Sequence, residues 1–261
     1  NTIDSVAHAP LSPNAAYTIA FWVRIDTNRS ADYQTLFTFL MGASEWESIM
    51  LDASNRLAIE AGVGGIGYRS AAGSAFGTGT WRYVALVRSS TTSLKAYVNG
   101  TETLSLTTNV STRSAAVSEF AFGSDGYDED SRSSIAYARA WTAALNTTEL
   151  AAESASVSAV RTTDLWGDWP MQADGDDDTA NARHLTASGT VSYVTDGPVL
   201  PINGALTKIL AALISSATST VEIAGAVSKT LAALTCTATI ALDAGTGEGT
   251  LSATLAALTS A

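Results

Sequence analysis

Cysteine, lysine and long apolar runs are scarce in this chain. Its 261 residues contain one cysteine, Cys236, so no disulfide can form within the chain. Lysine occurs only three times, and the formal net charge is −11, which argues against a nucleic-acid partner because the phosphate backbone requires a basic face. No apolar run reaches the roughly 18 residues that a membrane-spanning helix needs. We therefore expect neither nucleic-acid binding nor membrane insertion.

Histidine is equally scarce, which narrows the possible catalytic chemistry. His8 and His184 are the only two, and neither belongs to a serine or cysteine nucleophile motif. They do not show the short His-to-His spacing of a metal site. Because histidine is the side chain that most often moves protons near neutral pH, acid–base catalysis has few candidates here. We interpret both residues as ordinary histidines.

What the sequence does contain, up to about Pro198, is a series of short strand patterns. Tyr17–Ile25 alternates, so that every second residue is apolar and lies on one face. The pair Asn99-Gly100 separates two further strand patterns and is typical of a tight β-hairpin, because both residues tolerate positive φ. The other candidate strands are 35–40, 48–51, 56–60, 81–88, 94–98, 102–106 and 135–141. Many short strands with almost no helix predict an all-β antiparallel sandwich or jelly roll over residues 1–198.

One short helix is expected within this β-rich part. Asn146 and Glu149 have the spacing of a capping box, in which each side chain bonds the backbone of the other residue. This box opens the segment Leu150–Ser154. The sequence therefore predicts a helix that begins at Asn146.

The order of several motifs resembles a known family. The segments Tyr17–Arg24, Trp81–Arg88, Lys95–Gly100 and Ile135–Trp141, followed by Leu165–Trp169, are similar to the concanavalin A-like, laminin G-type jelly roll. The resemblance covers roughly residues 1–198 and implies a two-sheet antiparallel sandwich. Members of this family include lectin-like binding modules and glucanases, so both sugar binding and sugar cleavage have to be considered.

Cleavage of a glycan with retention would need two carboxylates about 5 Å apart. In this family they usually come from alternate residues of one strand. The nearest pattern is Glu45-Trp46-Glu47, with Asp52 further along, but Ile49 stands where a third carboxylate would be expected. We favour a solvated strand edge or loop for this segment and predict no catalytic residues.

Two acidic clusters could hold calcium. Asp125, Asp128 and Asp130 lie in a loop before the last predicted strand, and Asp174, Asp176, Asp177 and Asp178 lie in another. Carboxylates around a glycine suit Ca²⁺, a hard ion that takes about six to eight oxygen ligands. A solvated acidic turn is the alternative for both clusters. The first cluster is the better candidate, because in lectin-like jelly rolls a loop calcium often shapes the sugar site.

Aromatic rings beside such loops could stack on sugars. Trp46, Tyr68 and Tyr127 lie in loop-like contexts and are the candidate sugar-binding residues, although a structural role is the alternative for each. The other tryptophans, which lie in strand-like segments, are expected in the core: Trp22, Trp81, Trp141, Trp166 and Trp169.

The last part of the chain, residues 199–261, repeats itself. A pattern that begins at Gly204 returns at Gly225 and Gly249, with starts 21 and 24 residues apart. The spacing of its leucines also fits a helix face, but its threonine, serine and valine content favours short strands. A repeat buries its apolar face only against neighbours. The repeats resemble those of tailed-phage virion proteins, which implies assembly.

Together these patterns favour a non-enzymatic structural or adhesion protein on a virion or another extracellular surface, of the phage-fibre or capsid-decoration type. The jelly roll would contact host-surface glycans, and residues 199–261 would self-associate into a trimer or higher oligomer or bind a virion structural protein. A secreted or cell-surface lectin-like module of a bacterium is the alternative. A glycan-cleaving enzyme is the second alternative.

Overall fold

A computed structural model of the chain describes residues 2–5, 14–29, 32–41, 44–63, 66–107, 110, 119–124, 129–188, 191–193, 197–198, 200, 234–241 and 248–255. The chain separates into two compact units, Asn1–Leu206 and Thr207–Ala261. In the described part of the chain, no helix is both long enough and apolar enough to span a bilayer.

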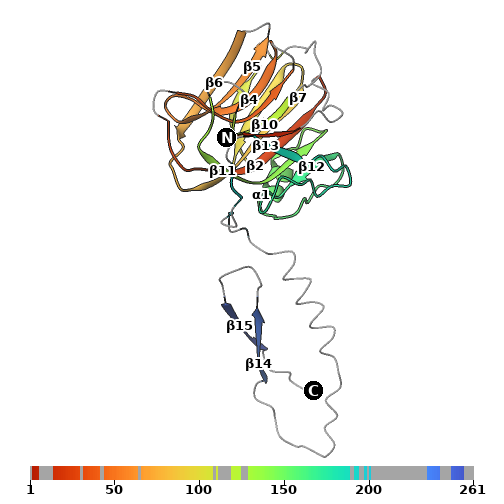
Figure 1. Cartoon of the computed structure of the whole chain (residues 1–261). Helices are drawn as coiled ribbons and strands as arrows, with labels where there is room; N and C mark the ends of the chain where they lie inside the picture. The colour runs from red at the N-terminus through yellow and green to blue at the C-terminus, as the bar shows by residue number, and fades with distance from the viewer. Residues whose placement is uncertain are drawn as a thin grey trace, which may run out of the picture. The chain divides into compact units, whose positions relative to one another are not determined.

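The first unit is a sandwich of two antiparallel sheets (Figure 1). One sheet has seven strands in the order β13-β1-β10-β3-β4-β5-β6 and the other has six in the order β12-β11-β2-β7-β8-β9. This confirms the predicted all-β, concanavalin A-like jelly-roll class. The seven strands are β13 (Leu185–Ser188), β1 (Thr2–Ser5), β10 (Glu119–Phe122), β3 (Gln34–Leu40), β4 (Trp46–Leu51), β5 (Arg56–Val63) and β6 (Ile66–Ala75). The six are β12 (Leu165–Trp169), β11 (Ser133–Trp141), β2 (Tyr17–Ile25), β7 (Trp81–Ser90), β8 (Ser93–Val98) and β9 (Thr101–Leu106).

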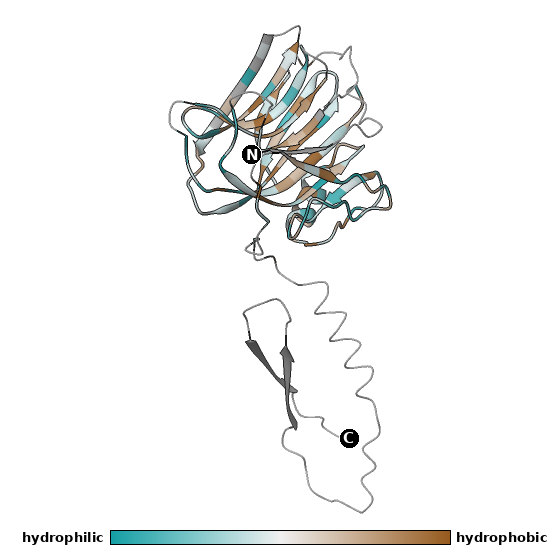
Figure 2. Cartoon of the chain, in the orientation of Figure 1, coloured by the Kyte–Doolittle hydropathy of each residue, from teal (hydrophilic) through white to brown (hydrophobic). Residues whose placement is uncertain are grey.

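The core lies between the sheets, where the alternating residues of both meet. The inward row of β2 is wholly buried, as its alternation predicts, and it packs against the phenylalanines of β3 and β10. Phe37 and Phe120 have ring centroids 5.0 Å apart in an edge-to-face arrangement. Burial of each such ring contributes about 1.5–3 kcal/mol, and edge-to-face pairs add to this. Figure 2 shows apolar residues alternating with more polar ones along these strands.

The hairpin between β8 and β9 forms where Asn99-Gly100 predicts it. Asn99 and Gly100 adopt positive φ of 49° and 79°, which a two-residue hairpin turn of this kind requires. The Asn99 side chain also accepts a hydrogen bond of 3.0 Å from the backbone N–H of Tyr83. The turn is therefore hydrogen-bonded to β7 as well as joined to its own strands, β8 and β9.

The predicted helix is α1 (Thr147–Ser154), with Asn146 as its N-cap. Both hydrogen bonds of the capping box are present: Asn146 accepts from the backbone N–H of Glu149 at 3.0 Å, and Glu149 accepts from that of Asn146 at 2.9 Å. The apolar side of α1 is buried through Leu150, which packs in a second hydrophobic cluster with Tyr83 and Trp141. This cluster covers the outer side of the six-stranded sheet.

The second unit contains an antiparallel hairpin, β14 (Leu234–Ala241) paired with β15 (Glu248–Leu255). The pairing places Leu234 opposite Leu255 and Ala238 opposite Leu251. β14 begins within the second sequence repeat and β15 includes the start of the third, so these parts of the repeats are strands, as favoured from composition.

Candidate functional site

A pocket of about 570 Å³ lies where β2 ends and β11 begins. It is called the rim pocket below. β2 contributes Arg24, and Asp26 follows directly; β7 contributes its first residue, Trp81. The remaining lining residues come from β10 and the turn after it, from the two residues before β11 and the first half of β11, and from the chain after β12. They are Phe122, Gly123, Ser131–Ala136, Met171, Gln172, Val191–Tyr193 and Gly197.

Three polar side chains at the rim pocket form a closed ring of hydrogen bonds, the rim triad. Arg24 donates through Nε to Asp26 Oδ1 at 2.8 Å and through its Nη2 to Ser134 Oγ at 3.0 Å. Ser134 in turn donates to Asp26 Oδ2 at 2.8 Å. The antiparallel register of β2 and β11 pairs Arg24 with Ser134 directly, which explains why residues so distant in sequence meet.

An aromatic face lies next to the triad. The register of β2 and β7 pairs Arg24 with Trp81. The guanidinium carbon of Arg24 lies 5.1 Å from the centroid of the indole ring, within the range of a cation–π contact. Trp81 is half-buried. Of the tryptophans that were expected in the core, it is the one that lines this pocket.

Two residues with positive φ lie at the rim pocket or directly beside one of its lining residues in sequence. Tyr137, in the middle of β11, has φ of 49°, and the pairing with β2 is shifted there by a bulge. Met171, which lines the pocket, has φ of 57°. The backbone N–H of Tyr137 donates to the carbonyl of Pro170 at 3.1 Å and links the two segments. Positive φ is costly for such residues and persists where the surroundings hold it; bulges of this kind re-aim neighbouring side chains.

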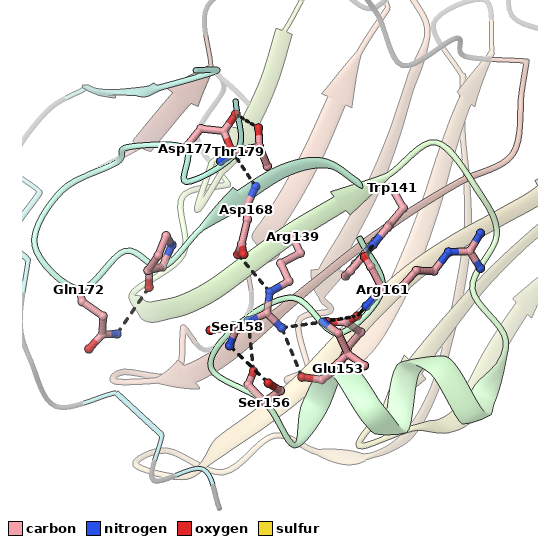
Figure 3. A network of polar contacts seen from close by, with 12 residues as sticks. Arg139, Trp141, Glu153, Ser156, Ser158, Arg161, Asp168, Gln172, Asp177 and Thr179 are labelled. Carbon is pink, nitrogen blue, oxygen red and sulfur yellow. Dashed lines mark hydrogen bonds and ion pairs between the residues drawn. The ribbon is translucent and has the colours of Figure 1, made fainter. Parts of the chain in front are cut away.

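A second polar cluster lies further along β11 and consists of Arg139, Glu153 and Asp168 (Figure 3). It is called the enclosed network below. Arg139 donates to Asp168 at 3.0 Å and to Glu153 at 2.9 Å. Glu153 also accepts the backbone N–H groups of Val160 and Arg161. Burial raises the pKa of Glu153 and that of Asp168. The network therefore fastens the segment after α1 to β11 and β12.

A family model for the concanavalin A-like lectin/glucanases superfamily matches residues 2–151, which is more than half of the 261 residues. The chain belongs to this superfamily. The comparison with curated proteins found no match.

Solved structures of similar fold include a candidate carbohydrate-binding protein from Bacteroides ovatus, with 19% identity and a TM-score of 0.55 over 78% of this chain and 60% of that one. A sialidase from Trypanosoma rangeli has 19% identity and a TM-score of 0.45, over 53% of this chain and 22% of its own. Domain 4 of an extracellular arabinanase from Geobacillus stearothermophilus, in complex with arabinotriose, has 20% identity and a TM-score of 0.46, over 54% and 66%. The chain thus spans about a fifth of the sialidase. These likenesses concern the fold.

Of the predicted sugar-binding aromatics, Trp46 is not one of the residues that line the rim pocket. Trp46 opens strand β4 instead of lying in a loop, so its expected loop context is wrong. Its half-buried indole lies against the backbone of Gly62 on β5, where a side chain would collide with the ring. Tyr68 belongs to β6, again a strand where a loop was expected. Tyr127 lies outside the described residues.

The first acidic cluster is described only in part. Asp125 and Asp128 lie outside the described residues. Asp130 is half-buried, and its backbone forms an isolated β-bridge with that of Thr35. Its carbonyl accepts a hydrogen bond of 2.9 Å from Arg29. Within the described ranges, no group of three or more histidine, cysteine, aspartate or glutamate residues is arranged to hold a metal ion. Calcium at this loop stays a prediction.

The second acidic cluster divides into exposed and bound carboxylates. Asp177 is buried and accepts hydrogen bonds from the backbone N–H groups of Asp168 at 3.0 Å, Thr179 at 2.9 Å and Arg183 at 2.9 Å. Asp176 is largely exposed and lies 3.0 Å from His184. Asp177 therefore organises its own turn, because its lone pairs are already occupied by protein donors.

The segment Glu45–Glu47 is not the solvated edge that the sequence suggested. Glu47 is completely buried between the sheets, where it binds the guanidinium of Arg88 and the hydroxyl of Tyr17. Glu45 is also buried, and Asp52 accepts hydrogen bonds from Ser54 and Arg56 in its hairpin. Glu47 shares the inward face of β4 with Ile49 and Leu51, which the alternation of the strand would have indicated.

Proposed function

We propose that the chain is a non-enzymatic glycan-binding protein that holds a sugar unit in the rim pocket. The observation that carries this is the position of the Trp81 indole beside the hydrogen-bonded ring of Arg24, Asp26 and Ser134. Membership of the concanavalin A-like lectin/glucanases superfamily supports it.

The chemistry of the pocket suits a carbohydrate. A sugar ring offers an apolar C–H face and a rim of hydroxyl groups, and an indole covers the former while fixed polar groups bind the latter. Asp26 is about 43% exposed at its side chain and Arg24 about 20%, so both keep surface for a ligand. Because the triad holds its groups in place before binding, little side-chain entropy is lost when a sugar docks.

The absence of catalysis is part of the proposal. A retaining glycosidase needs two carboxylates that reach the same bond. Among the described residues that line the rim pocket, Asp26 is the one carboxylate, and Glu47 is enclosed in the core by Arg88. A reducing-end assay on β-glucans tests this: we expect no release, and release that disappears in Glu45→Gln/Glu47→Gln would contradict the proposal.

Assembly and setting complete the proposal. We infer that residues 199–261 self-associate or bind a virion structural protein and so display the sandwich on a virion or another extracellular surface, as in a phage fibre or capsid decoration. An isolated two-stranded hairpin is marginally stable in water, and this supports a need for neighbours around β14 and β15. Light scattering of the full chain beside a chain that ends at Pro198 tests it. A trimer or larger against a monomer supports assembly, and two monomers favour a secreted lectin-like module.

The binding site is tested with a matched pair of tryptophan variants. Titration against a glycan panel should show that Trp81→Ala weakens binding at least about tenfold, since an aromatic contact and its exclusion of water are lost. Trp46→Ala removes a half-buried tryptophan outside the pocket and should leave the affinity unchanged. If Trp46→Ala abolishes binding while Trp81→Ala retains it, the site lies on β4 to β6 and the rim pocket is the wrong choice.

A further inference from the structure

Arg132 differs from the other basic side chains in the described part of the chain. Each of the others there either bonds a carboxylate or lies over an aromatic ring. Arg24, Arg29, Arg56, Arg69, Arg88, Lys95, Arg139 and Arg161 form ion pairs, whereas Arg82 lies over Phe76 and Arg183 over Trp166. Arg132 is exposed and lines the rim pocket, and its guanidinium has neither kind of partner among the residues that the structure describes.

The backbone of Arg132 is nevertheless firmly placed. Its carbonyl accepts hydrogen bonds from the N–H groups of Asp26 at 2.9 Å and of Thr27 at 3.3 Å. On either side, the hydroxyls of Ser131 and Ser133 are 2.7 Å apart. The arginine is therefore carried by a fixed segment beside the rim triad rather than by a loose loop.

The local charge of the pocket is opposite to that of the whole protein. Asp26 is matched by Arg24, with Ser134 donating to its second oxygen, so the positive charge of Arg132 remains uncompensated among the described lining residues. The chain as a whole carries −11. A negative protein repels anions in general, so an anionic group would be held only by a local and directional contact.

We propose that the rim pocket binds a sugar unit that carries a carboxylate, with Arg132 as the partner of that carboxylate. The inference rests on the proposed glycan-binding function and specifies its ligand. A guanidinium binds a carboxylate through two parallel N–H donors, which suits a uronic or a sialic acid equally. Trp81 and the rim triad would take the ring and its hydroxyls.

Titration of the full chain with carboxylated glycans and their methyl esters tests the proposal. The probes are oligogalacturonate, an oligosaccharide that contains glucuronate, and sialyllactose, each beside its own methyl ester, which lacks the charge and carries one extra methyl group. We expect at least one acid to bind roughly tenfold more tightly than its ester, as a charge-assisted hydrogen bond provides. The preference should fall as salt is raised. Which acid binds distinguishes uronic from sialic recognition.

The variant Arg132→Gln should remove this preference, so that each acid binds about as tightly as its ester. Arg56→Gln is the matched control: it removes the same charge from an exposed arginine that does not line the pocket, and the preference should persist. Equal binding of acids and esters by the wild-type chain would overturn the inference and leave the proposed function standing. If no glycan binds in either form, the proposed function fails and the inference falls with it.

Discussion

The rim triad and the enclosed network use the same groups in different surroundings. Both combine an arginine with a carboxylate, and both involve β11, through Ser134 and Arg139. The side chains of Arg139 and Glu153 are each 1% exposed, whereas Asp26 is 43% exposed. In the enclosed network, protein donors bind the carboxylates of Glu153 and Asp168, so these charges hold chain segments together. At the rim, part of each group faces water, and a ligand can replace that water. Burial, more than composition, separates the enclosed network from the candidate site at the rim.

The largest expected effect is the loss of Arg139. Arg139→Ala would leave Glu153 and Asp168 buried without their cation, and breaking a buried ion pair in this way costs about 3–5 kcal/mol. Urea denaturation of the variant and the wild type measures the change in the free energy of unfolding. A loss below about 1 kcal/mol would mean that the enclosed network behaves like a surface pair, and the comparison would then collapse.

A smaller effect is expected at Asp26, and in binding rather than in folding. Asp26→Asn keeps the shape of the side chain but removes the charge that orients Arg24 and that, in the proposed site, would accept sugar hydroxyls. Affinity for the best glycan of the panel should fall about tenfold, or about 1.4 kcal/mol, while the free energy of unfolding changes by less than about 1 kcal/mol. The pair of measurements, titration and denaturation, would count against a binding role if stability fell and affinity did not.

The fold could be predicted because its signals are local. Alternation in Tyr17–Ile25, the turn at Asn99-Gly100 and the capping box at Asn146 each depend on residues close in sequence, and each has the predicted structure. The prediction that Glu47 lies at a solvated edge or loop was wrong, although the local pattern indicates its position. Glu47 alternates with Ile49 and Leu51 along the strand and therefore points inward with them. Its charge suggested solvent, but Arg88 compensates it inside the core.

The site could not be predicted, because it depends on strand register. Arg24 meets Trp81 and Ser134 only through the pairing of β2 with β7 and with β11, and neither residue is near Arg24 in sequence. Trp81 was therefore assigned to the core as part of an ordinary strand. The positive φ of Tyr137 could not be predicted from the sequence either, because tyrosine rarely adopts this conformation. A composition argument finds acidic loops and loop aromatics, but it does not find a pocket assembled from strand ends.

Helix α1 offers a pH test of the same comparison. Burial raises the pKa of Glu153 above its ordinary value of 4.5, whereas a hydrogen bond from the backbone of Asn146, together with Arg161, lowers the pKa of Glu149. A carboxyl with a raised pKa contributes stability that is present at low pH and is lost as the pH rises through its folded pKa. A carboxyl with a lowered pKa contributes stability that is present above its unfolded pKa and is lost as the pH falls through its folded pKa.

Denaturation of Glu153→Gln and Glu149→Gln at several pH values, roughly 3 to 7, separates the contributions of the two carboxyls to the free energy of unfolding. Relative to Glu153→Gln, the wild type should lose stability as the pH rises above 4.5. Relative to Glu149→Gln, it should lose stability as the pH falls below 4.5. Slopes of the same sign for both variants would show that burial does not distinguish the two ends of the helix.

The smallest expected effect is that of Arg24 on stability. Arg24→Gln removes an ion pair with Asp26 and a cation–π contact with Trp81, both at the solvent-facing rim. Exposed ion pairs contribute about 0.2–1 kcal/mol and exposed cation–π contacts about 0.5–1 kcal/mol, so the free energy of unfolding should fall by about 1 kcal/mol. Asp26 then remains hydrated, unlike the carboxylates around Arg139. A loss as large as that of Arg139→Ala would mean that the rim triad holds the sandwich together, and its groups would then be tied to the fold rather than available to a sugar.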